Sequence, residues 1–218
     1  MSLANVYDDA ENVNTEVLEE VMRAKKGDPS KFPSFWEEDE EDIDQPAQWE
    51  IDRDPNKRIL WAAENNHLEI ATSMLKDQPD LVNVRDDDKY SPLHRACYNG
   101  HIDMVRMLLS RGADIQARTI DGWQPLHSAA RWNQASVVSL LLHNGAEVNV
   151  QTQGGQTALH LAASEPDSRE TLETLLMNCY IDVNMKNAAG EIPSDICRRT
   201  SKHFHLFQIH DPSVNCLK

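Results

Sequence analysis

Apolar residues in this chain gather into short runs that return at a regular interval. Met107-Leu108-Leu109 and Leu140-Leu141-Leu142 stand 33 residues apart, and each run is followed by a Gly-Ala turn that ends in an acidic residue. Ahead of each run, apolar residues recur three or four positions apart, which is the spacing of one face of an α-helix. The pattern predicts units of two short helices joined by a tight turn, with almost no β-strand.

A repeated phrase opens three of these units. It reads Ser-Pro-Leu-His-Arg-Ala at 91–96, Gln-Pro-Leu-His-Ser-Ala at 124–129 and Thr-Ala-Leu-His-Leu-Ala at 157–162, so the three histidines are 33 residues apart. A fixed period of this length indicates stacked repeats, because no single unit of this size buries its own apolar face. Such a stack offers an extended surface to a partner and no ready-made deep catalytic pocket.

These segments resemble the ankyrin family, whose repeat follows the pattern T-P-L-H-x-A-A, then G-H-L-x-x-V-x-x-L-L, then G-A-D-V-N. Residues 100–109, with the sequence GHIDMVRMLL, match the middle part almost residue for residue. The resemblance implies an all-α ankyrin-repeat solenoid of about four to five stacked helix-turn-helix units, capped at both ends. It also implies a non-enzymatic protein that binds other proteins, in which the repeated histidine hydrogen-bonds the turn between units.

Counting from the repeated phrase places a repeat domain at 55–211, after an acidic region at 1–54 and before a short tail at 212–218. The first unit lacks the Pro-Leu-His phrase and the last is degraded, as end caps should be, because their outer faces meet water. We expect the second helix of the last unit near Lys202–Ile209. The units are expected at 55–83, 84–116, 117–149, 150–184 and 185–211.

The amino-terminal region carries most of the chain's net negative charge. Residues 1–54 contain 17 acidic and 5 basic residues and few apolar ones, so we expect disorder, with at most a short helix at 16–26. Phe35, Trp36 and Trp49 lie in or beside its acidic run and are candidate anchors for a partner. Three interpretations stay open: a solvating arm, a segment that orders on a basic or groove-bearing partner, or a cover for Arg85, Arg118 and Arg131.

The formal net charge of −15 disfavours binding to DNA, RNA or anionic membranes, which all depend on basic side chains. The first residues lack the basic and apolar segments of a secretory signal, and no apolar run approaches the ~20 residues that span a bilayer. The four cysteines form no close pair, and Cys97 falls where an ankyrin repeat packs a small alanine. We expect an intracellular protein of the nucleus or cytoplasm, and a monomer.

Metal and catalytic sites are not expected. The repeated histidines belong to successive layers roughly 10 Å apart, too far to share one ion. His203, His205 and His210 fall outside the repeat pattern, but no cysteine lies near them at the spacing of a zinc finger. The chain has no nucleophile-elbow, phosphate-loop or H-E-x-x-H motif, and carboxylates on a flexible arm cannot be desolvated for acid–base work. We therefore expect no enzyme activity and no cofactor.

Partner-binding candidates follow from the ankyrin pattern, in which partners usually meet the finger loops and the exposed positions of the first helix. Units two and three place Tyr, Trp and Arg there, the residue types that dominate binding hot spots. The competing interpretation is that Trp123 and Trp132 pack against each other or a neighbouring finger and only stabilise the stack. The candidate set is Arg85, Asp88, Tyr90, Tyr98, Arg118, Asp121, Trp123, Arg131, Trp132 and Gln156.

Some positions depart from the family pattern or match a modification signal. Gln124 replaces the usual threonine and Lys89 the usual glycine, so we expect less regular turns there, with Lys89 at positive φ or its finger reshaped. Asn149 and Asn184 resemble asparagine-hydroxylation sites of ankyrin repeats. Ser201 follows a pair of arginines, as in a basophilic kinase site.

The sequence as a whole predicts an adaptor that docks one face of a partner protein on the Tyr, Trp and Arg residues of units two and three. A nuclear gene-regulatory complex is one setting that the resemblance allows. Two other functions stay open. One is an inhibitor that covers the active site of an enzyme, and the other is an acidic escort for a basic client, whose binding would weaken steeply with salt.

Overall fold

The computed structural model describes residues 53–210. The predicted anchors Phe35, Trp36 and Trp49, with almost all of the acidic region and the whole tail at 212–218, lie outside these residues. Every regular element in the described part is a helix, which confirms the predicted all-α class, and none of these helices is long and apolar enough to cross a bilayer. The α-helices are α3 (Pro55–Glu64), α4 (Leu68–Asp77), α5 (Pro92–Asn99), α6 (Ile102–Ser110), α7 (Pro125–Arg131), α8 (Ala135–His143), α9 (Ala158–Ala163), α10 (Arg169–Leu176) and α11 (Pro193–Thr200), and the 3₁₀-helices are η1 (Pro79–Asn83) and η2 (Lys202–His210).

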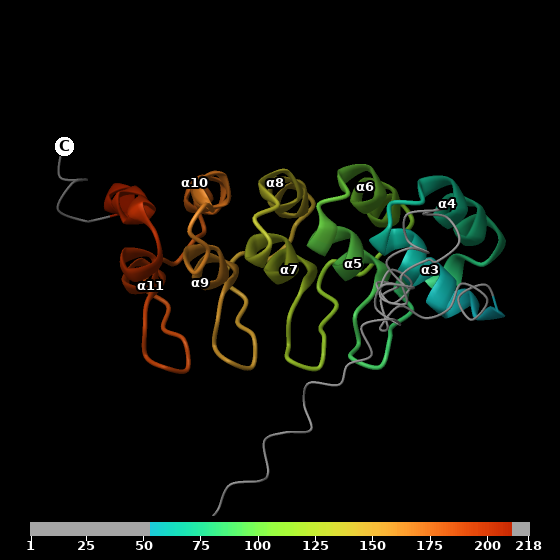
Figure 1. Cartoon of the computed structure of the whole chain (residues 1–218), viewed down its shortest axis with the longest axis horizontal. Helices are drawn as coiled ribbons and strands as arrows, with labels where there is room; N and C mark the ends of the chain where they lie inside the picture. Colours follow the sequence, from blue (N-terminus) through green and yellow to red (C-terminus); the bar gives the residue numbers. More distant parts are fainter. Residues whose placement is uncertain (1–52, 211–218) are drawn as a thin grey trace, which may run out of the picture. The chain divides into compact units, whose positions relative to one another are not determined.

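The helices of the repeat domain form two layers (Figure 1). The first helices of the units, α3, α5, α7, α9 and α11, lie side by side, and each contacts the next. The second helices α4, α6, α8 and α10 form the other layer. Loops that we call fingers, at 84–91, 117–124, 150–157 and 185–192, project from the first layer on the side away from the second. The first helices and the fingers therefore share one face of the stack.

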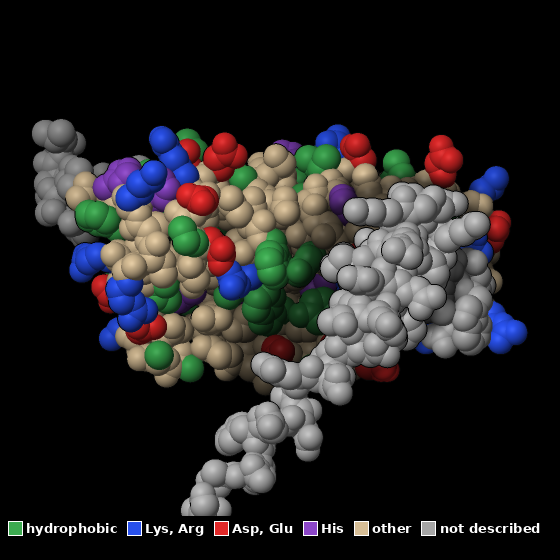
Figure 2. Space-filling view, in the orientation of Figure 1, with side chains coloured by type: hydrophobic (Ala, Val, Ile, Leu, Met, Phe, Trp, Pro, Cys, Tyr) green, Lys and Arg blue, Asp and Glu red, His purple; other side chains and the backbone are tan. Residues whose placement is uncertain are grey.

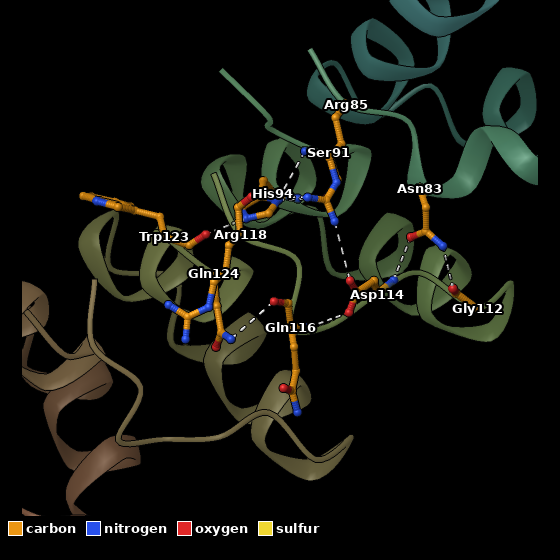
Figure 3. Close-up of polar contacts among 10 residues, drawn as sticks. All are labelled: Asn83, Arg85, Ser91, His94, Gly112, Asp114, Gln116, Arg118, Trp123 and Gln124. Carbon is orange, nitrogen blue, oxygen red and sulfur yellow. Dashed lines mark hydrogen bonds and ion pairs between the residues drawn. The ribbon is translucent and has the colours of Figure 1, made fainter. Parts of the chain in front are cut away.

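The repeated histidine fixes the start of each first helix and ties it to the next unit (Figure 3). His94 Nδ1 accepts a hydrogen bond from the Ser91 N–H at 3.2 Å, while the Ser91 hydroxyl oxygen accepts one from the His94 N–H. Because Nδ1 faces a group that only donates, Nε2 carries the proton, and it donates to the Trp123 carbonyl at 3.1 Å. His127 and His160 bond the carbonyls of Val150 and Glu191 in the same way. The structural role that the resemblance implied for these histidines is confirmed.

Small residues on the first helices let neighbouring units approach closely. Ala62, Ala96 and Ala129 occupy the same position of successive units, and all are fully buried. Cys97 follows Ala96 and is also fully buried, as the sequence predicts. Large side chains from the second helices fill the space behind them, among them Leu75, Leu108, Leu141 and Leu175. The core therefore runs along the stack rather than inside any one unit.

The fingers share one type of turn and are joined to each other through the backbone. In the first finger the Lys89 N–H donates to the Asp86 carbonyl at 2.9 Å, and the Asp86 N–H donates to the Tyr90 carbonyl at 3.1 Å. Between fingers, the Ile120 N–H donates to the Asp88 carbonyl at 3.0 Å. Equivalent bonds join Gln153 to Asp121 and Ala188 to Gly154. Each finger is thus held at both its base and its tip.

The turn requires a left-handed residue at its fourth position. Gly122, Gly155 and Gly190 occupy this position at φ of 77°, 70° and 79°, and Lys89 is held there at φ 64°, which confirms the positive φ expected for it. The irregular turn expected at Gln124 is absent. This residue keeps φ −100° and ψ 164°, close to the values at Ser91, because its amide reaches the Gln116 carbonyl at 3.3 Å without disturbing the backbone.

Replacing Lys89 with glycine is expected to stabilise the protein by about 0.5–1 kcal/mol. Relief of left-handed strain of about 1–2 kcal/mol outweighs the roughly 0.5–1 kcal/mol of added chain entropy in the unfolded state. Urea unfolding at constant m-value measures the change. Lys89→Ala is the control, because it removes the same charge and keeps the strain. A gain in Lys89→Ala equal to that in Lys89→Gly would contradict the backbone explanation.

The last unit closes with the 3₁₀-helix η2, at the position where the second helix is expected near Lys202–Ile209. Ser201 is extended, at φ −144° and ψ 162°, and separates η2 from α11. The buried side chains of η2 are His203, Leu206 and Phe207, and the last two belong to the hydrophobic core. The helix therefore lies where the sequence predicts the cap.

Candidate protein-binding surface

A hollow of about 430 Å³ opens between the first helices and the fingers of the first three units. Figure 2 shows hydrophobic side chains gathered over α7 and the finger loops below it. We call this feature the aromatic hollow, because four aromatic side chains form much of its wall. It is lined by Glu64, Asp88, Tyr90, Arg95, Tyr98, Trp123, Ser128, Arg131 and Trp132.

Tyr98 and Trp132 form an exposed ring pair in the hollow. Tyr98 lies in the last turn of α5 and Trp132 follows the end of α7, so the stacking of two units brings the ring centres to 4.5 Å. The rings nevertheless stay 40% and 47% exposed. Trp132 packs on Tyr98 of the neighbouring unit rather than on a finger. This contact leaves nearly half of the indole exposed. Large rings exposed in this way are typical of a binding surface.

Tyr90 and Trp123 occupy the same finger position in successive units. The Tyr90 N–H donates to Asp86 Oδ1 at 2.7 Å, and the Trp123 N–H donates to Thr119 Oγ1 at 3.1 Å. The Trp123 carbonyl also accepts the bond from His94, so its backbone is held from both sides. Both side chains are half-buried. The backbone at both positions is therefore held before a partner binds, which lowers the conformational entropy that binding costs.

Arg95 lines the hollow and is already paired. Its guanidinium lies 2.7 Å from an Asp86 oxygen and 3.3 Å from a Glu64 oxygen, and 5.4 Å from the centre of the Tyr90 ring. Within residues 53–210 its Nε atom has no hydrogen-bond partner. The side chain therefore links the first helix of unit one to the finger of unit two, with its charge balanced by carboxylates.

Arg131 is paired as well. It forms an ion pair with Glu165 of the next unit, and its guanidinium lies 5.7 Å from the centre of the Trp132 ring. The contact orients Trp132 from one side while Tyr98 contacts it from the other unit. The positive charge of both arginines in the hollow is thus neutralised by the protein itself.

The finger tips beside the hollow are acidic. Asp88 and Asp121 are exposed on adjacent tips, and neither forms an ion pair with any residue that the structure describes. Burial raises the pKa of the Tyr90 hydroxyl, the Asp121 carboxylate raises it further, and Arg95 opposes both. The negative field of the tips therefore reaches into the hollow.

The structure brings together part of the candidate set and separates the rest. The hollow collects Asp88, Tyr90, Tyr98, Trp123, Arg131 and Trp132. Asp121 lies beside it at a finger tip. Gln156 is half-buried and closes its own finger, with its N–H donating to Thr152 Oγ1 at 3.2 Å.

Arg85 and Arg118 lie outside the hollow and link neighbouring units (Figure 3). Arg85 Nη1 donates to the Arg118 carbonyl at 3.4 Å, and its Nη2 lies 3.7 Å from an Asp114 oxygen. Arg118 Nη1 donates in turn to the Gln151 carbonyl at 3.3 Å. These two side chains therefore act in the structure as braces between the fingers.

Glu64, Arg95 and Ser128 line the hollow but are missing from the candidate set. Glu64 occupies in unit one the position that Tyr98 and Arg131 occupy in units two and three. Counting the same positions in the first unit therefore identifies Glu64 as a candidate. Arg95 and Ser128 directly follow the histidine of the repeated phrase, and the ankyrin pattern gave a role only to that histidine. The Ser128 hydroxyl is buried and has no hydrogen-bond partner in the described part of the chain.

The modification candidates lie in ordered parts of the stack. Asn149 is engaged at both ends of its amide, since Nδ2 donates to the Tyr180 carbonyl at 2.7 Å and Oδ1 accepts from the Asp182 N–H at 2.9 Å. The Asn184 N–H donates to Asp182, and the Ser201 hydroxyl oxygen accepts from the His203 N–H at 3.2 Å. Among residues 53–210, no three His, Cys, Asp or Glu side chains are placed to hold a metal ion.

Comparison with known proteins defines the class. The family model described as ankyrin repeats in three copies matches residues 40–119, 59–152 and 116–187, and this chain belongs to the ankyrin-repeat family. Repeats of this family generally mediate protein–protein interaction and are non-catalytic. The resemblance stated from the sequence is therefore confirmed.

The chain is similar to proteins from several species that share the name ankyrin repeat domain-containing protein 49. The Bos taurus protein is 54% identical over 198 residues, which cover 86% of this chain and 83% of the relative. The Homo sapiens protein is 53% identical over 197 residues, with 86% and 82% covered. The Drosophila melanogaster protein is 46% identical over 200 residues, with 90% and 91% covered. The shared name refers to the repeats and does not say what these proteins bind.

Proposed function

We propose that this protein is a non-enzymatic adaptor that binds a partner protein in the aromatic hollow of its second and third units. The exposed Tyr98–Trp132 pair carries the proposal. Rings of this size bury a large area with few rotatable bonds, and residues of this type dominate interface energetics. The hydrogen bonds that hold Tyr90 and Trp123 add preorganised walls to the same site.

An intracellular setting, in the nucleus or the cytoplasm, belongs to this proposal. Cys179 is exposed and carries a free thiol. Free surface thiols suit a reducing compartment, where they are not drawn into disulfides. A nuclear gene-regulatory complex is the setting in which we would look for the partner first.

Affinity capture from a cell extract tests the adaptor function. We expect Trp132→Ala to reduce the recovery of a specific partner by about tenfold or more, since truncating a hot-spot residue costs about 2 kcal/mol. The free energy of unfolding should change by no more than about 1 kcal/mol, because much of the indole is exposed.

Tyr180→Ala is the matched control, because Tyr180 is an aromatic residue 80% exposed and outside the aromatic hollow. It should leave capture unchanged. Retention of every partner by Trp132→Ala would count against the proposal, and so would parallel losses of capture and stability. The same partners lost in Tyr180→Ala would show that capture reflects exposed aromatic surface in general.

A further inference from the structure

The charge around the aromatic hollow restricts the chemistry of what it binds. Both arginines of the hollow are already neutralised by carboxylates of the chain itself. Asp88 and Asp121, in contrast, have no paired cation among residues 53–210. An acidic group from a partner would have to break an existing ion pair, whereas a basic group meets carboxylates that are free.

Trp123 supplies an aromatic surface for such a basic group. Within the described part, arginine guanidiniums lie over the rings of Tyr90 and Trp132, and none lies over the ring of Trp123. Indole is the aromatic ring that attracts cations most strongly. A planar guanidinium stacks on it while also reaching a carboxylate, which the compact ammonium of lysine does less well. Trp123 lines the same hollow as Asp88 and lies two residues from Asp121.

We infer that the aromatic hollow binds an arginine side chain from a basic segment of the partner protein, stacked on Trp123 and paired with Asp88. The flanking residues of that segment contact the exposed Tyr98–Trp132 pair. This inference rests on the proposed function and adds the chemistry of the partner to it. It also explains why unpaired acids lie at the finger tips beside Trp123, which is the indole of the hollow that no arginine of the described residues covers.

The test uses the full-length chain and four pools of fluorescent nine-residue peptides that differ only in the central residue, Arg, Lys, Leu or Glu. Fluorescence polarisation measures the binding of each pool. We expect the Arg pool to bind about tenfold more tightly than the Leu pool, with Lys between them and Glu weakest. Trp132→Ala should weaken the binding of every pool. This weakening would show that the peptides bind in the hollow.

Asp88→Asn separates the charge from the hydrophobic contact. It should lower the affinity for the Arg pool by about fivefold and leave the Leu pool unchanged. Asp87→Asn is the matched control. It makes the same charge change on the neighbouring residue of the same finger, which does not line the hollow, and should change the affinity for neither pool by more than about twofold.

The possible results distinguish this inference from the proposed function. Equal binding of the Arg and Leu pools, both weakened by Trp132→Ala, would overturn the arginine site and support the adaptor. Preference for the Glu pool would overturn it too and would indicate that Arg95 and Arg131 exchange their internal ion pairs for external ones. If Trp132→Ala weakens the binding of no pool, the inference is wrong, and affinity capture then decides on the adaptor function by itself.

Discussion

The free energy of unfolding is expected to fall by several kcal/mol when the pH is lowered from about 7 to about 4. Two histidines of the repeated phrase cause the loss. Burial lowers the pKa of His94 and of His127 to about 4, and the hydrogen bonds to the Trp123 and Val150 carbonyls oppose this shift only in part. Each Nδ1 atom also accepts a backbone N–H, so a second proton on the ring would break the cap of its helix.

The direction of the effect follows from which state takes up protons first. In the unfolded chain these histidines titrate near pH 6.5, so acid protonates the unfolded state before the folded one. Their contribution to stability is complete above about pH 6.5, declines as the pH falls, and levels off below about pH 4. Each histidine accounts for roughly 3 kcal/mol over this window, against a total stability of about 5–15 kcal/mol for a typical domain.

Urea unfolding at a series of pH values measures this dependence. Replacing one buried histidine, as in His127→Gln, should reduce the slope of unfolding free energy against pH by up to about 1.4 kcal/mol per pH unit between about pH 6 and pH 4.5. His143→Gln, at an exposed position, should keep the wild-type slope. Identical slopes for wild type and His127→Gln would show that His127 does not contribute to the acid sensitivity.

The fold could be predicted almost completely, because the repeated phrase encodes contacts that are local within two adjacent units. His94 caps its own helix and bonds the next finger, so one residue type at one spacing fixes both the unit and its stacking. Lys89 could be placed at positive φ because its position in the turn belongs to glycine elsewhere. The 3₁₀ winding of η2 could not be predicted in this way, because the sequence of the last unit departs from the pattern that the other units share.

The aromatic hollow could be predicted only in part, because the repeat period gives a position on a face and not the direction of a long side chain. Arg85 and Arg131 were both candidates from the same rule. Arg85 turns along the stack to a carbonyl of the next finger, while Arg131 stays in the hollow beside Trp132. The contact of Trp132 with Tyr98 also depends on the stacking of two units, which the sequence of either unit alone does not contain.

Two neighbouring fingers lie in close contact at Gly155, and this contact predicts the other large effect. Gly155 lies at φ 70°, and a Cβ atom there would come within 2.8 Å of the Ala188 backbone nitrogen in the next finger. Backbone atoms cannot rotate away as a side chain can, and the Ala188 N–H is held by the Gly154 carbonyl at 3.0 Å. A methyl group at this position must therefore push two fingers apart.

Gly155→Ala is expected to lower the free energy of unfolding by about 2–5 kcal/mol, combining left-handed strain of about 1–2 kcal/mol with overpacking of about 1–3 kcal/mol. Gly190→Ala is the matched control. It has the same turn position and φ 79°, but nothing within 4 Å of the added atom, so it should cost only the strain. Gly122→Ala, whose added atom would lie 3.2 Å from the Gln153 nitrogen, should fall between them. Urea unfolding of the three variants measures these losses. If contact between fingers stabilises the stack, the loss is largest for Gly155→Ala and smallest for Gly190→Ala. Equal losses in all three would show that backbone strain is the whole effect.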